Sequence, residues 1–144
     1  MIGDRLKDAF GAAAMALCAA TASPAFASDD CVAALNAPQP PWIAEGDGVR
    51  VAFIAKPMPV PLNQHFALEL APCDDARAAS ALQVDADMPA HRHGMNYRAM
   101  VVPLRDGVYR AQGLMFHMPG RWRIVVDVVI EGRTRRATRE IDVQ

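Results

Sequence analysis

Residues 122–130 read Trp-Arg-Ile-Val-Val-Asp-Val-Val-Ile, and this stretch decides the fold. Its even-numbered positions are all apolar, whereas Arg123, Asp127 and the following Glu131 fall on the odd-numbered side. Successive side chains of an extended chain point to opposite faces, so the pattern predicts a strand with one face in a hydrophobic core. The core positions are Trp122, Ile124, Val126, Val128 and Ile130.

Short apolar runs separated by turn residues continue on both sides of this strand. Arg105-Asp106-Gly107 predicts a hairpin turn, because glycine tolerates the positive φ of tight turns, and Glu131-Gly132 predicts another. Seven short strands in about 95 residues favour an all-β, two-sheet sandwich, with a small closed barrel as the alternative. The expected strands are 49–55, 65–71, 80–87, 97–104, 108–116, 121–130 and 134–143.

The first 27 residues have the three-part pattern of a secretory signal. Arg5 and Lys7 precede an uncharged, Ala-rich stretch at 9–22, and Ser23-Pro-Ala-Phe-Ala27 ends in small residues at the positions that a signal peptidase reads. The apolar stretch is shorter than the roughly 20 residues that cross a bilayer. We therefore expect cleavage after Ala27, a periplasmic mature protein that begins at Ser28, and no transmembrane anchor.

Removal of the signal leaves two cysteines, Cys31 and Cys73. An even number of cysteines in an oxidising compartment favours a disulfide, with two buried free thiols as the alternative. A short capped helical turn is expected just before and around Cys31, ended by the prolines at 38, 40 and 41. The bridge would tie this N-terminal segment, residues 28–48, to a β domain spanning 49–144.

Composition excludes several classes of function. The chain has 144 residues, 15 basic against 16 acidic, and thus lacks the clustered positive charge that nucleic-acid binding requires. The mature segment has only two serines, Ser28 and Ser80, its two cysteines are expected to be bonded, and Thr134 and Thr138 have no histidine nearby in sequence. An activated nucleophile is therefore not expected. No Gly-rich phosphate loop follows a strand. We expect a single small domain that is not an enzyme.

Histidine and methionine cluster in two places. The segment 88–95, Met-Pro-Ala-His-Arg-His-Gly-Met, holds two imidazoles and two thioethers, and His117-Met118 adds one of each. In an extended segment, His91, His93 and Met95 would project to one side. A two-residue loop at Asp106-Gly107 would pair Met95 with Met118, and a bulge at Gly113 would pair it with His117 instead.

Imidazole with thioether suits copper, particularly Cu(I), because sulfur of methionine is a soft ligand. The sequence therefore predicts one site built from His91, His93, Met95, His117 and Met118. Zinc, with help from Asp85 or Asp87, is the less favoured metal. The alternative is that methionines fill gaps in the core and histidines bond to loop backbone. We prefer that reading for Met100 and Met115, and we expect His65 to be a polar residue at a strand start.

Three segments resemble the YtkA-like domain, which is related to the FixH family. They are Met88-Pro-Ala-His-Arg-His-Gly-Met-Asn-Tyr97, Asp106-Gly-Val-Tyr-Arg-Ala-Gln-Gly-Leu114 and Phe116-His-Met-Pro-Gly-Arg-Trp122. The resemblance covers roughly residues 49–131. It implies an immunoglobulin-like sandwich and, in some relatives, copper handling or maturation of a respiratory oxidase. FixH proteins carry an N-terminal membrane helix, whereas this chain has a cleavable signal, so a direct role in oxidase assembly does not follow.

Together these features favour a periplasmic protein that binds or delivers copper and meets a cell-envelope or oxidase-assembly partner. The alternative is a metal-free sandwich module that docks to an envelope partner, with its Met-Pro loops as an adaptable apolar contact surface.

Overall fold

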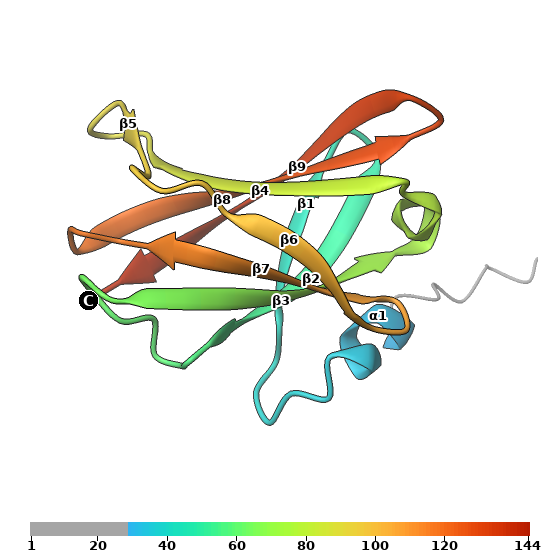
Figure 1. Cartoon of the computed structure of the whole chain (residues 1–144), viewed down its shortest axis with the longest axis horizontal. Helices are drawn as coiled ribbons and strands as arrows, with labels where there is room; N and C mark the ends of the chain where they lie inside the picture. Colours follow the sequence, from blue (N-terminus) through green and yellow to red (C-terminus); the bar gives the residue numbers. More distant parts are fainter. Residues whose placement is uncertain (1–28) are drawn as a thin grey trace, which may run out of the picture.

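The structure, a computed structural model, describes residues 29–144. The expected signal at 1–27 lies outside this range. One short helix precedes nine strands, and a 3-10 turn, η1, interrupts them (Figure 1). The elements are α1 (Asp29–Ala34), β1 (Trp42–Gly46), β2 (Val49–Lys56), β3 (His65–Cys73), η1 (Asp74–Ala78), β4 (Ala81–Met88), β5 (His93–Gly94), β6 (Met100–Arg105), β7 (Val108–Met115), β8 (Gly120–Ile130) and β9 (Arg133–Val143).

The fold is all-β and sandwich-like, as the sequence predicted, and all seven expected strands are present. The strand number is nine because β1 and β5 are additional. All nine form one antiparallel sheet in the order β5-β4-β8-β9-β1-β2-β3-β7-β6. A single residue pair, Glu45 with Thr138, joins β1 to β9, so the sheet folds there into two layers. Because β5 and β6 do not pair, the sheet curls over without closing into a barrel.

The core lies between the two layers. Trp122, Ile124, Val126 and Val128 of β8 are completely buried, which confirms the face assigned from their alternation. They pack with residues of β2, β3 and β7, including Phe53, Leu68 and Leu114. The indole of Trp122 also stacks on the ring of Phe116, with centroids 4.3 Å apart. This stack fills the end of the sandwich at which β8 begins.

A disulfide joins Cys31 of α1 to Cys73 at the end of β3, as expected from the sequence. Both cysteines are buried in a second apolar cluster, with Leu35 on one side and Ile54 on the other. The helix thereby covers the outer face of β2 and β3. Figure 1 shows α1 near one end of the molecule and β5 at the other. Among residues 29–144, no helix is long and apolar enough to span a bilayer.

A bulge at Gly113 changes which side chains of β7 face the core. Phe66 pairs with Leu114 but the next residue, Ala67, pairs with Gln112, so Gly113 has no partner on β3. Gly113 adopts a φ of 89°, which L-residues with a side chain rarely accept. Ahead of the bulge the odd-numbered Ala111 is buried, and beyond it the even-numbered residues Leu114 and Phe116 are buried. Met115 and His117 therefore lie on the side of the chain opposite to the buried Leu114 and Phe116.

Candidate metal site

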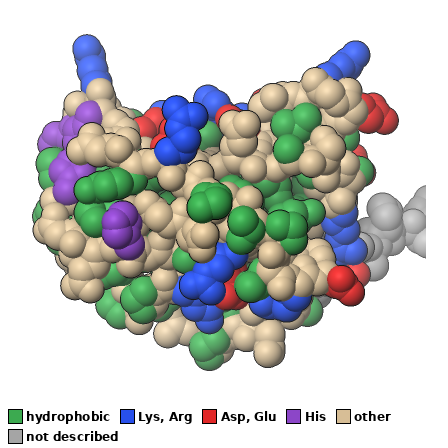
Figure 2. Space-filling model, in the orientation of Figure 1, with side chains coloured by type: hydrophobic (Ala, Val, Ile, Leu, Met, Phe, Trp, Pro, Cys, Tyr) green, Lys and Arg blue, Asp and Glu red, His purple; other side chains and the backbone are tan. Residues whose placement is uncertain are grey.

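Three imidazole rings gather at the end of the molecule where β5 lies. The ring centroid of His93 is 5.1 Å from that of His117 and 6.1 Å from that of His91. His91 lies in the turn after β4 and His93 begins β5, whereas His117 comes from the segment between β7 and β8. Figure 2 shows histidine side chains grouped at this end beside hydrophobic side chains. The structure thus brings together the two histidine clusters that the sequence singled out.

His91 and His93 meet by a different route from the expected one. Residues 89–92 form a turn, in which the His91 N–H donates to the carbonyl of Met88 at 3.0 Å and Arg92 has a φ of 54°. The segment is therefore not extended, and the expectation that His91, His93 and Met95 share one side of a strand is wrong. The left-handed residue Arg92 reverses the chain instead, which carries His93 back to the edge of β4.

The expected register between Met95 and His117 is also wrong. The two-residue turn at Asp106-Gly107 is present and Arg105 pairs with Val108, but β6 extends only to Met100, which pairs with Gln112. The Met95 N–H instead donates to the carbonyl of Ala86 at 3.0 Å, beside β5 on the edge of β4. The chain uses residues 95–99 to cross from one layer to the other. His93 and His117 consequently meet across the open end of the sandwich and not along a hairpin.

Trp122 forms the floor beneath the two closest rings. The rings of His93 and His117 lie edge-on to its indole, with centroids 5.9 Å and 5.8 Å away. Its Nε1–H donates to the carbonyl of Met118 at 3.0 Å, which fixes the segment that carries His117. Because the indole is fully buried and stacked on Phe116, this floor is rigid.

The hydrogen bonds leave ring nitrogens free to bind a ligand. Nδ1 of His93 lies 3.1 Å from the carbonyl of Gly94, and because a carbonyl only accepts, this nitrogen carries the proton. Nε2 then presents a lone pair, as in many metal-binding imidazoles. The rings of His91 and His117 make no hydrogen bond or ion pair within the described range of the chain. His93 and His117 are half-buried and His91 is exposed.

The predicted thioether ligands lie at the same end. Met95 and Met118 are half-buried and pack against the core cluster. Met88 is fully buried, with its Cε so close to Gly120 that a Cβ there would lie 3.0 Å from it, so it is a core residue. Met100 is 57% exposed, which contradicts the expectation that it fills the core.

The two nearby carboxylates are already engaged. Asp87 accepts two hydrogen bonds from Arg123, at 3.0 Å and 2.7 Å, which raise the pKa of that guanidinium. An oxygen of Asp85 accepts the N–H of Ala86 at 2.8 Å. Within residues 29–144, no three His, Cys, Asp or Glu side chains form a group that could hold a metal.

One of the imidazoles, that of His93, lines an open groove of about 1090 Å³. The outer side of β4 and β8 forms one wall, and the crossing segment that begins at Pro89 forms the other. His93 and Met95 line the groove, together with the exposed Arg92 and Arg98, which form no ion pair in the described part of the chain. A ligand of His93 is therefore reachable from solvent.

The sequence interpretation missed one pair of side chains. His65, the first residue of β3, pairs with Met115, the last residue of β7. Its ring also contacts that of Tyr97 edge-on, with centroids 5.1 Å apart. Met115 faces His65 only because of the bulge, since regular pairing would place Leu114 there. In the sequence, the one signal of this shift was Gly113, an isolated glycine inside a strand pattern.

Comparison with known proteins identifies the family of the chain. None of the curated proteins matches the chain. Among solved structures, a crystal structure of a DUF4426 family protein from Pseudomonas aeruginosa PAO1 is 12% identical, with a TM-score of 0.46, over 72% of this chain and 96% of that one. The model of the YtkA-like family matches residues 44–127, which is more than half of the chain and includes β4–β7 and most of β8. The chain therefore belongs to the YtkA-like family.

Proposed function

We propose that this protein binds Cu(I) in the periplasm and delivers it to, or accepts it from, a cell-envelope partner. The observation that carries the proposal is the pair His93 and His117, whose rings lie 5.1 Å apart on the rigid floor of Trp122. Three or four ligands from the set His91, His93, Met95, His117 and Met118 would hold one ion. The protein would act as a carrier and not as an enzyme.

The donor chemistry supports copper over other metals. Soft thioether sulfur with imidazole favours Cu(I), whereas zinc prefers thiolate, imidazole and carboxylate. Both cysteines are bonded to each other, and Asp87 is paired with Arg123. In the described part of the chain, no thiolate is then available to a metal beside His93. Bound copper would supply a single exchangeable soft cation at the mouth of the groove.

The location follows from the export signal in the sequence. If the signal is removed after Ala27, the periplasmic protein begins at Ser28, and intact-mass measurement of protein from the periplasm gives that mass. A mass that retains residues 1–27 would contradict the proposed processing. A periplasmic carrier also fits the family resemblance, which suggests an oxidase-assembly or other envelope protein as the recipient.

Competition with a chromophoric Cu(I) chelator tests the proposed site. Wild-type protein should withdraw Cu(I) from the chelator, and His93→Ala and His117→Ala should weaken binding to a similar extent because both rings belong to one site. Met100→Leu provides the matched control, since this exposed methionine lies on β6 away from the imidazoles. Normal affinity in His117→Ala combined with loss in His93→Ala would overturn the shared site.

Tryptophan fluorescence gives an independent measurement. The chain has two tryptophans, and Trp42→Phe leaves Trp122 as the single emitter. Copper bound between His93 and His117 should quench this emission, because both rings contact the indole. Unchanged emission during copper uptake would place the ion elsewhere on the protein.

A metal-free docking module is the second candidate. Several large apolar side chains stay exposed on and beside β6: Tyr97 (45%), Met100 (57%) and Leu104 (40%). Such side chains are available to an envelope partner without any metal. A wild-type protein that fails to compete for copper but binds its partner through these residues would favour this function.

A further inference from the structure

His65 and Met115 form a second imidazole–thioether pair outside the proposed copper site. They face each other across β3 and β7, so their Cβ atoms are about 4.5–5.5 Å apart. Their strand neighbours Phe66 and Leu114 are both buried, which places His65 and Met115 together on the outer face. His65 is exposed and Met115 half-buried. The pair therefore lies at the surface of the molecule.

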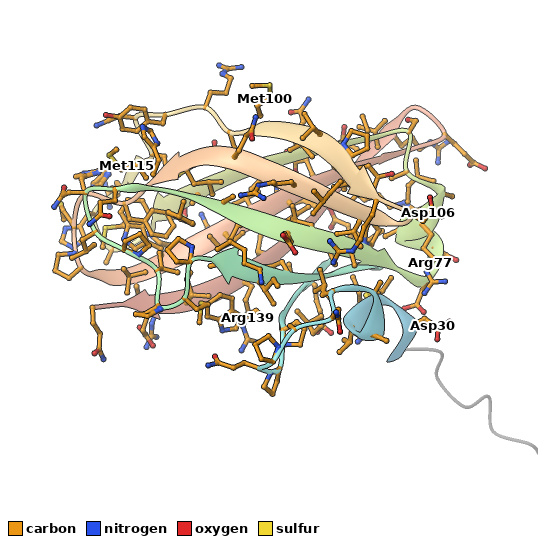
Figure 3. The ribbon with its side chains drawn as sticks, turned by 60° about the horizontal axis from the view of Figure 1, so that its bottom comes forward. Asp30, Arg77, Met100, Asp106, Met115 and Arg139 are labelled. Carbon is orange, nitrogen blue, oxygen red and sulfur yellow. A yellow bond between two sulfur atoms is a disulfide. The ribbon has the colours of Figure 1, made fainter. Side chains whose placement is uncertain are left out.

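The ring of His65 is held without using its nitrogens. Tyr97 contacts it edge-on, and within residues 29–144 the ring makes no hydrogen bond or ion pair. Met115 is only half-buried, and it faces an imidazole directly across the strand pair. Figure 3 labels Met115 at one end of the molecule and shows Met100 apart from it.

The Gly113 bulge connects this pair to the site already described. Beyond the bulge, Met115 and His117 are two positions apart and both lie opposite to the buried side chains of this segment. Imidazole and thioether groups thus form a row along the open end of the sandwich. The row runs from His91 through His93 and His117 to Met115 and His65. Neighbouring rings in the first part of this row are separated by 6.1 Å and 5.1 Å.

We propose that His65 and Met115 form a second, more exposed Cu(I) site through which the ion enters or leaves the site at His93 and His117. The proposal rests on the proposed function for its choice of metal. One imidazole and one soft thioether suffice for a weakly held Cu(I) ion, and a weaker outer site next to a stronger inner one suits exchange with a partner. Tyr97 positions the imidazole and does not coordinate the metal.

The test is a Cu(I) titration of the mature, disulfide-bonded protein under anaerobic conditions, with ascorbate in place of thiol reductants. Wild type should bind two equivalents, the second more weakly. His65→Gln and Met115→Leu should each remove the weaker equivalent and keep the stronger one, and Met100→Leu should retain both. In an NMR spectrum, the methyl signal of Met115 should shift only as the second equivalent is added.

A His93→Ala, His117→Ala double variant separates the two proposals. It should retain one weak equivalent, which Met115→Leu then abolishes. One equivalent in wild type that is unaffected by Met115→Leu would overturn the second site and leave the first intact. One equivalent that Met115→Leu removes and the double variant keeps would overturn the first site alone. No uptake by wild type would overturn both.

Discussion

The imidazole of His93 lies 5.1 Å from that of His117, although 24 positions separate them in the sequence. The two rings come from opposite layers, one at the edge of β4 and the other just beyond β7. Both rings contact Trp122 edge-on and so share its support. Anything that opens the sandwich at this end would therefore separate the rings before it exposes the rest of the core.

Replacing Gly113 tests the role of the bulge. A Cβ at Gly113 has room, with Arg98 O at 3.7 Å, so the cost of Gly113→Ala is the strain of its φ of 89°, about 1–2 kcal/mol. Gly107→Ala is the matched control, because Gly107 has a φ of 66° and open space around it. Urea unfolding should give similar losses of stability for both variants.

Only the Gly113 variant should also weaken copper binding, since His117 depends on the bulge for its direction. Gly107 lies in the β6–β7 turn, where Arg105 donates to the carbonyl of Ala34 near α1, at the other end of the molecule. Equal copper affinities in the two variants would show that the bulge does not position His117.

Copper affinity should decrease in acid. Imidazole binds metal only in its neutral form, so protons compete with Cu(I), whereas thioether sulfur does not titrate at these pH values. Chelator competition at about pH 7.5 and about pH 5.5, on either side of the ordinary imidazole range, measures the effect. A site formed by methionine alone would show equal affinity at both, and this would exclude the histidines as ligands.

The ion pair of Asp127 with Arg136 should make stability depend on acid pH. Arg136 donates two hydrogen bonds to Asp127, at 2.7 Å and 2.8 Å, and these lower the pKa of the carboxyl in spite of partial burial. A carboxyl whose pKa is lowered on folding contributes stability above its unfolded pKa, and this contribution is lost as pH falls through the folded value.

Asp127→Asn should accordingly cost about 1 kcal/mol or less at neutral pH and nothing at the acid end of the titration. Thermal unfolding between about pH 7 and pH 2.5 follows both proteins across the carboxyl range. Glu131→Gln, in the exposed β8–β9 turn, is the control, because Glu131 has no ion pair among the described residues. A constant difference between Asp127→Asn and wild type over the whole range would exclude the ion pair as its source.

The disulfide should matter for stability and not for copper. The bridge closes a loop of 42 positions, so Cys31→Ala with Cys73→Ala should lower the free energy of unfolding by about 4 kcal/mol. Denatured, unreduced wild type should show no free thiol on labelling, and two labelled thiols would disprove the bridge. Copper affinity should remain, because α1 lies at the other end of the molecule from β5 (Figure 1).

The sequence predicted seven of the nine strands in the described range but not the connections between them. Alternation along β8 correctly placed Trp122 and Ile124 in the core, because a half-buried strand must alternate. The short strands β1 and β5 were missed, since β5 has two residues and is defined by pairing with β4 and not by its own composition. The sequence correctly predicted that His91, His93 and His117 lie close together in space. The strand register from which this was argued was wrong.

Side-chain direction was harder to predict than position. The turn at Arg92 depends on one left-handed residue, and nothing in Pro-Ala-His-Arg distinguishes it from an extended segment. A bulge at Gly113 was foreseen, but its partner strand is β3 and not β6. For that reason His65 and Met115 were assigned to separate roles, and their pairing became visible only with the strand register.

The number of residues between Gly113 and His117 affects the proposed metal binding as much as the identity of the ligands does. Deleting Leu114 while the bulge is kept would shift the alternation beyond Gly113 by one position, turn Met115 and His117 inward and expose Phe116, without replacing a single ligand. Two relatives could therefore hold identical histidines and methionines and differ in metal uptake. In comparing members of this family, the spacing from the bulge glycine to the next histidine is the criterion by which to separate chains that present these donors from chains that bury them.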